Sequence, residues 1–231
     1  MISGVEERWE YTWQVLAQLH IQAERVWPPK PSLHLAKEMY AIHDYDKEVN
    51  LSDPQHQRYF SLLAAWKHVL HHVAHHPDLE PHNFAIIMED DISLQEDVSL
   101  AAARNAILHG FDLARSDGWL YLAVCPTEYF PETEQYQGLT YSKMVGWCAH
   151  ALAFTKHRAA SIMHEMHTSM KEDFLTQFPS YSFGHGVDQM LSQYGHIHNG
   201  TWTVATNLQG KHNAVGLFYQ DRERFHSTIN G

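Results

Sequence analysis

The sequence predicts an α/β protein built on a mostly parallel central sheet flanked by helices. Short apolar runs alternate with segments whose apolar residues recur at helical spacing, which is typical of that class. One run, residues 84–88, is apolar throughout, as strands buried on both faces of a parallel sheet are. A chain of 231 residues can form one sizeable core, so we expect a single domain over residues 1–231.

The expected elements follow in order along the chain. Helices are predicted over residues 6–25, 55–76, 98–113, 156–170 and 187–193, where apolar side chains recur every three or four positions. Strands are predicted over residues 84–88, 119–124 and 201–205, and one within residues 144–154. We expect residues 32–50 to be irregular or to hold short elements, residues 126–143 to form a long polar loop, and the C-terminal stretch to be a polar tail.

Composition excludes some classes of function and indicates a compartment. The net charge is −11 with histidine neutral, and Lys and Arg do not cluster, which argues against a nucleic-acid-binding protein. Cys125 and Cys148 lie in apolar contexts and do not form a Cys-x-x-Cys pair, which argues against a disulfide framework and fits a reducing compartment. The start of the chain does not resemble a signal peptide, and no apolar run is long enough to span a bilayer; the predicted location is the cytoplasm.

The strongest candidate for chemistry is the acidic triplet Glu89-Asp90-Asp91, which directly follows the apolar run. Open α/β sheets bind their ligands at the carboxyl ends of the strands. Continued strand alternation would place Glu89 and Asp91 on one side and Asp90 on the other. Carboxylate oxygens suit Mg²⁺, Mn²⁺ or Ca²⁺ better than zinc. The competing interpretation is a solvated acidic turn after a strand.

The 20 histidines include a group on the predicted second helix: His68, His71, His72, His75 and His76. Pairs at i and i+4, such as His71 and His75, can bind transition metals. No carboxylate partner accompanies them, so the sequence favours a solvated helical face over a functional site.

Several segments resemble glycosyltransferase family 25, the lipopolysaccharide and collagen galactosyltransferase type. They are, in order, the Ser3–Arg8 opening with its following helix, the Ser61-x-x-x-x-Trp66 helix with Leu70, the Ile86–Ile92 block containing the acidic triplet, the Gly146–Phe154 strand, and the Gly186–Leu191 helix. Three departures stand out. Only Met1-Ile2 remains of the family's first strand, Leu62 replaces a histidine, and His150 replaces a tyrosine.

The resemblance implies a GT-A fold, a nucleotide-sugar donor and a divalent cation, with Mn²⁺ preferred over Mg²⁺. The acidic triplet would then stand where such enzymes keep an Asp-x-Asp motif. Asp91 is the expected direct metal ligand, and Glu89 or Asp90 would hold a metal-bound water or the ribose hydroxyls. Arg8 is a candidate nucleotide contact, and His212 is a candidate further metal ligand from a late loop.

The function expected from this resemblance is transfer of a hexose from a nucleotide-diphosphate sugar, with a UDP-hexose favoured, to a glycan or other hydroxyl acceptor. Asp188, between a glycine-containing loop and a short helix, is the candidate base for the acceptor hydroxyl. Two alternatives remain open. One is a non-catalytic relative that binds nucleotide or carbohydrate, and the other is a divalent-metal hydrolase or nucleotidyltransferase.

Overall fold

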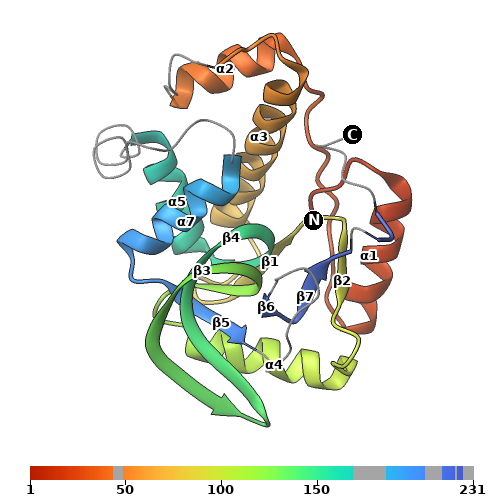
Figure 1. Cartoon of the computed structure of the whole chain (residues 1–231), viewed down its shortest axis with the longest axis vertical. Helices are drawn as coiled ribbons and strands as arrows, with labels where there is room; N and C mark the ends of the chain where they lie inside the picture. Colours follow the sequence, from red (N-terminus) through yellow and green to blue (C-terminus); the bar gives the residue numbers. More distant parts are fainter. Residues whose placement is uncertain (44–48, 169–185, 206–214, 222, 226–231) are drawn as a thin grey trace.

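The computed structural model describes residues 1–43, 49–168, 186–205, 215–221 and 223–225. Figure 1 shows the helices arranged around a strongly curled sheet. The helices are α1 (Glu6–Gln18), α2 (Leu33–His43), α3 (Pro54–His75), α4 (Leu100–Leu113), α5 (Lys156–Thr168) and α7 (Gly186–Ile197). The strands are β1 (Phe84–Met88), β2 (Ile92–Leu94), β3 (Trp119–Tyr136), β4 (Leu139–Thr155), β5 (Thr201–Ala205), β6 (Val215–Gly216) and β7 (Phe218–Gln220).

The central sheet is mostly antiparallel, so the predicted mostly parallel sheet is wrong. Its order is β1-β4-β5-β3-β6 with an additional β3–β4 pairing. β4 runs antiparallel to β1, β3 and β5, and only the β3–β5 pairing is parallel among these strands. The α/β class itself is confirmed, since helices flank the sheet. The alternation of strands and helices suggested parallel crossovers, but β3 and β4 are joined directly as a hairpin.

The β3–β4 hairpin replaces the loop predicted over residues 126–143. Its two strands turn at Gln137 and Gly138, which both have positive φ, 49° and 79°. Turns with two positive-φ residues match the twist of paired strands, so the connection can be very short. Most side chains from Thr127 to Gln135 are at least partly exposed, which is why this part of the sequence looked like a polar loop. Figure 1 shows the hairpin extending as a long arm from the rest of the fold.

The N-terminal segment forms a short parallel pairing next to the end of β1. Ile2 forms parallel bridges with both Val26 and Glu89, so it lies between the segment after α1 and the end of β1. Helix α1 ends at Gln18, earlier than predicted, and His20 adopts a left-handed φ of 59°. The chain that follows is extended up to Val26, which brings it back beside Ile2.

The sheet is buried on both faces. Trp119 and Tyr121 of β3 belong to a core shared with α2, α3, α5 and α7, while Leu120 and Leu122 belong to a second core shared with α1 and α4. The small β2–β7 sheet also packs in this second core, through Ile92 and Phe218. Neighbouring residues of a strand point to opposite faces, so one apolar run supplies both cores.

The helix predicted over residues 55–76 is confirmed as α3, to within one residue at each end, and it forms much of the first core. The Asp53 side chain accepts a hydrogen bond from the backbone N–H of Gln55 at 2.8 Å, and Pro54 stands at the first helical position. Phe60, Trp66 and Leu70 are fully buried along one face. The partly buried residues beside this stripe include Leu62 near the start of the helix, where it reaches the site described below.

The structure differs from the sequence analysis in the state of the cysteines. Cys125 is disulfide-bonded, whereas the sequence suggested unpaired thiols. The chain has one other cysteine, Cys148, which lies in the adjoining strand β4. The expectation failed because the pairing of β3 with β4, which brings distant residues together, was itself not predicted. The argument for a reducing compartment therefore loses its basis.

Within the described ranges, no helix combines the length and the hydrophobicity needed to cross a membrane. This agrees with the absence of a long apolar run in the sequence.

Gly146 of β4 lies in tight contact with β3, so a substitution there tests the packing of the hairpin. A Cβ at this position would lie 2.4 Å from the carbonyl oxygen of Cys125 and 2.4 Å from Val124 Cγ2. We expect Gly146→Ala to destabilise the fold by roughly 1–3 kcal/mol, because the obstructing atoms include backbone. The midpoint of thermal unfolding should fall by about 2–12 °C. Gly4→Ala is the control, since its nearest contact would be an ordinary 3.5 Å to Pro28; equal midpoints for the two variants would contradict the packing argument.

Candidate functional site

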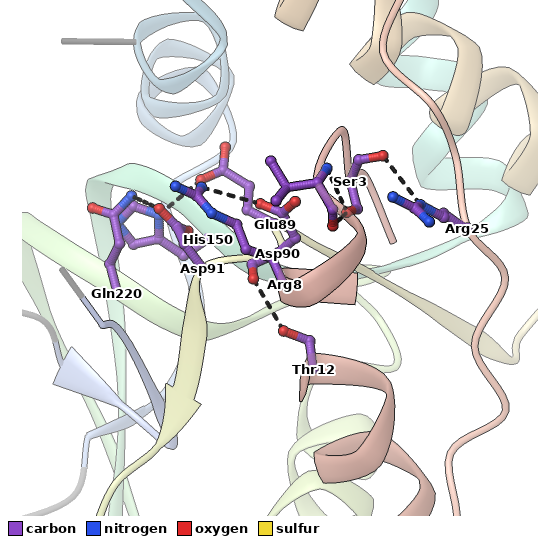
Figure 2. A network of polar contacts seen from close by, with 10 residues as sticks. Ser3, Arg8, Thr12, Arg25, Glu89, Asp90, Asp91, His150 and Gln220 are labelled. Atoms are coloured by element: carbon purple, nitrogen blue, oxygen red, sulfur yellow. Dashed lines mark hydrogen bonds and ion pairs between the residues drawn. The ribbon is translucent and has the colours of Figure 1, made fainter. Parts of the chain in front are cut away.

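The acidic triplet lies where β1 leaves the sheet, at the meeting point of four elements. Figure 2 shows Glu89, Asp90 and Asp91 surrounded by side chains from the N-terminal segment, α1, β4 and β7. The backbone N–H of Glu89 donates to the His150 carbonyl at 2.9 Å, continuing the β1–β4 pairing by one residue. The Thr12 hydroxyl donates to the Asp90 carbonyl at 3.1 Å and ties the triplet to α1.

All three residues of the triplet line one cavity, while Asp90 pairs with Arg8 of α1 and Glu89 pairs with His150 of β4. Regular strand geometry ends at Met88, and the chain bends through Asp90 and Asp91 before β2 begins at Ile92. Side-chain alternation holds only while the backbone stays extended and pleated.

Glu89 is paired with His150. The His150 Nδ1 atom lies 3.1 Å from Glu89 Oε2, and both side chains are mostly buried. Burial raises the pKa of Glu89 from its ordinary value of 4.5 to about 7, although the hydrogen bond and charge of His150 oppose the rise. Burial alone would lower the pKa of His150, but the hydrogen bond and negative charge of Glu89 raise it. The protonation of each group therefore depends on that of the other.

Asp90 is held by the start of the chain and by α1. Its Oδ1 lies 3.6 Å from Arg8 Nη1, and both side chains are close to nine-tenths buried. Burial raises the pKa of Asp90, while a hydrogen bond from Ser3 and the charge of Arg8 lower it. Arg8 also lines the cavity. The structure thus places the predicted nucleotide-binding residue Arg8 at the acidic triplet, where its charge offsets that of Asp90.

Asp91 is the carboxylate with an unsatisfied atom. The Gln220 side-chain amide donates to Asp91 Oδ2 at 2.7 Å, and the Asp91 carbonyl accepts from the N–H of Asp221 at 2.7 Å. Asp91 Oδ1 is buried and has no hydrogen-bond partner among the described residues. A buried carboxylate oxygen without a donor is unfavourable, and a hard cation is one partner that satisfies it. Asp91 Oδ1 therefore offers one ligand atom to a cation, but among the described residues the triplet does not bring three ligand atoms within 4.8 Å of one another.

The cavity beside the triplet has a volume of about 580 Å³, within the range of small-molecule sites. Its far wall is the segment 27–31 together with the start of α3, from which Arg58 and Leu62 contribute. The Ser61 hydroxyl donates to the Pro29 carbonyl and fixes this segment to α3. Trp27 is 59% exposed, and the Arg25 guanidinium lies 3.6 Å from its ring centroid. The cavity combines an aromatic wall and cationic side chains with an acidic end.

Asp188, the predicted base, lies in the first turn of α7 and is half-buried. Its negative charge raises the pKa values of both Glu89 and His150, so it lies within electrostatic range of the triplet. Asp188 is not among the described residues that line the 580 Å³ cavity. It approaches the triplet from the first core, on the side where α7 packs against β4.

The remaining predicted ligand, His212, lies outside the described residues. The sequence missed three contributors to the site. Gln220 sits in a stretch expected to be a polar tail, His150 was noted only as a departure from a family pattern, and Trp27 was not considered as a site residue. The strand β7 that carries Gln220 has just three residues, too few for periodicity to reveal it.

Comparison with known proteins adds no assignment. No family model matches the chain, and no curated protein matches its sequence. Chemically, the described residues offer one unpartnered carboxylate oxygen at Asp91, the cationic side chains Arg8, Lys30 and Arg58 with the Trp27 ring along the cavity, and a proton-exchanging group at Glu89 beside His150.

The buried Glu89–His150 pair predicts how the stability of metal-free protein depends on pH. Both groups bind a proton more tightly in the folded state. The contribution of Glu89 is therefore complete below pH 4.5 and is lost as the pH rises through about 7, whereas that of His150 is complete below pH 6.5 and is lost above it. Measured in EDTA, the free energy of unfolding should fall by roughly 3 kcal/mol through Glu89 between pH 4.5 and pH 7.

Glu89→Gln keeps a neutral side chain of the same shape and is the matched variant. Its free energy of unfolding should change much less between pH 5 and pH 8 than that of the wild type. Chemical denaturation at a series of pH values measures both profiles. Parallel profiles would show that Glu89 is not held protonated by burial.

Proposed function

We propose that the chain is a divalent-metal-dependent glycosyltransferase, which moves a hexose from a nucleotide-diphosphate sugar, a UDP-hexose by preference, to a glycan or other hydroxyl acceptor. The observation that carries the proposal is the buried, unpartnered Asp91 Oδ1 at the acidic end of an aromatic and cationic cavity. The resemblance of several segments to glycosyltransferase family 25, a GT-A family, supports the reaction class.

Asp91 would hold the cation, Mn²⁺ or Mg²⁺, through Oδ1, because Gln220 already occupies Oδ2. Such a cation supplies positive charge that offsets the charge developing on the leaving diphosphate. Glu89, kept in place by His150, would hold a metal-bound water or the ribose hydroxyls. Trp27 offers a ring for the base to stack on, and Arg58 and Lys30 offer positive charge for the phosphates.

In the transfer step, the bond between the anomeric carbon and the diphosphate oxygen breaks as the acceptor oxygen bonds to that carbon. The acceptor hydroxyl loses its proton, and Asp188 is the proposed base that takes it. The cluster provides electrostatic and positional preorganisation, because each carboxylate is fixed by a different protein group before any ligand binds.

A second candidate is a relative that binds the same ligands without turnover. Two observations favour it. Leu62, where the resembled family has histidine, lines the cavity, and His150 already engages Glu89. Binding and turnover separate the two candidates, so the tests below measure each.

Donor binding is tested by thermal unfolding with a panel of nucleotides and nucleotide sugars, in Mn²⁺ or in EDTA. A ligand that binds only the folded state should raise the midpoint by about 5–10 °C at a hundredfold excess over its Kd. We expect a Mn²⁺-dependent shift with a uridine nucleotide. Asp91→Asn should abolish it, whereas Asp97→Asn, an exposed carboxylate six residues along the chain, should keep it. No shift with any nucleotide in either condition would overturn both candidates.

Turnover is tested with Asp188→Asn. Loss of a general base should lower kcat by roughly 10²–10⁴-fold. The nucleotide-dependent midpoint shift should remain within about 1 °C of the wild type, because Asp188 does not line the cavity. Release of UDP from a donor and acceptor panel measures the rate. If the wild-type protein binds nucleotide but releases no UDP from any donor and acceptor pair, the non-catalytic candidate is supported. If kcat is unchanged in Asp188→Asn, Asp188 is not the base.

A further inference from the structure

The histidine-rich end of α3 has a carboxylate partner that the helix sequence does not contain. His72 lies in the last turn of α3 and His76 is its C-terminal capping residue. Glu24, on the extended segment after α1, lies against them, with its Oε2 atom 3.3 Å from His72 Nε2. One potential ligand atom from each of these three side chains falls within 4.8 Å of the others. The sequence analysis judged the histidine face to lack such a partner, and the fold supplies one from 48 residues upstream.

We propose that Glu24, His72 and His76 form a second divalent-cation site, which takes a borderline transition-metal ion, Zn²⁺ in the first place. Two imidazoles and a carboxylate are a ligand set that zinc uses, leaving a fourth position for water. Mn²⁺ and Mg²⁺ prefer oxygen ligands, so this site and the acidic triplet differ in the cation they select.

The geometry suits a tetrahedral ion. Zinc bonds of about 2.0–2.2 Å place neighbouring ligand atoms about 3.4 Å apart, close to the present 3.3 Å between Glu24 and His72. The His72 and His76 rings are nearly perpendicular, at 89°, with centroids 5.0 Å apart. Glu24 and His72 are about half exposed or more, so small rotations can close the site at little cost in packing. The partial negative charge at the C-terminal end of α3 also favours a cation there.

Such an ion would join two parts of the chain that frame the proposed donor cavity. Glu24 precedes Val26, which pairs with Ile2, and Trp27, which lines the cavity. Helix α3 contributes Arg58 and Leu62 to the same cavity from its other end. A cation at Glu24, His72 and His76 therefore fastens the segment 24–31 to α3. The inference does not depend on the proposed transferase activity, since it concerns ligands outside the cavity.

The chain provides a matched control on the same helix. His71 and His75 are also an i,i+4 pair, with stacked rings 4.2 Å apart. The Nδ1 atom of His75 lies 2.8 Å from the His71 carbonyl oxygen, within the helix. Among the described residues, the three-ligand group is the Glu24, His72 and His76 set, and the His71–His75 pair is not part of it. Removing either pair deletes the same number of histidines, so the two variants differ only in whether a carboxylate-supported site is lost.

The experiment is a competition titration of Zn²⁺ against a chromophoric chelator, together with thermal unfolding in Zn²⁺ and in EDTA. The wild type should show one tightest site. His72→Ala with His76→Ala should weaken it by more than about tenfold, Glu24→Gln should weaken it by a similar factor, and His71→Ala with His75→Ala should leave it unchanged. All variants should unfold at the wild-type midpoint in EDTA within about 1–2 °C, because none of the altered side chains is buried in the core.

Three outcomes would overturn the proposal. The His71/His75 variant could weaken Zn²⁺ binding as much as the His72/His76 variant does, which would indicate nonspecific binding to the helix. Asp91→Asn alone could remove the tightest Zn²⁺ site, which would place the ion in the acidic cavity instead. Finally, Zn²⁺ could bind all variants equally. If Asp91→Asn loses Mn²⁺-dependent nucleotide binding but keeps Zn²⁺ binding, the Zn²⁺ site is independent of the acidic cavity.

Discussion

The cost of burying three consecutive carboxylates determines the organisation of this fold around the end of β1. Each carboxylate recruits a partner from a different part of the chain: His150 from β4, Arg8 from α1, and Gln220 from β7. Desolvating a charge is unfavourable unless hydrogen bonds or opposite charge compensate for it. The N-terminal segment, the hairpin strand and the short C-terminal strand must therefore meet at one point. One oxygen of the triplet, Asp91 Oδ1, is buried without a hydrogen-bond donor among the described residues.

The sheet provides the frame that allows this convergence. β3 and β4 are long enough to belong to both the central sheet and the projecting arm, and β4 pairs with β1 over five residues that end beside Glu89. Because alternate residues of β3 enter cores on opposite faces, helices on both sides are fixed relative to the triplet. α3 then connects two regions, with the cavity wall at its start and the histidine-rich group at its end. A shift of this helix would move both together.

The Glu89–His150 pair places a proton-exchanging group at the acidic end of the cavity. His150 lies in β4 directly across from the end of β1, and its ring reaches Glu89. A histidine at that point adds a proton-exchanging group whose pKa is raised by the hydrogen bond and charge of Glu89, whereas a tyrosine would bring a neutral hydroxyl. The pair therefore couples the charge of the acidic end to pH in the physiological range.

The sequence by itself determined the elements whose residues carry a local signal. Periodicity located α3, α4 and α5 to within a few residues, and the apolar runs located β1, β5 and the first third of β3. Local chemistry suffices there, because helix caps, spacing and continuous hydrophobicity are properties of neighbouring residues. Strand direction, the hairpin arm, the Cys125 disulfide and the partners Gln220 and Glu24 were decided by the tertiary structure alone. These depend on contacts between residues far apart in the chain, which no local pattern encodes.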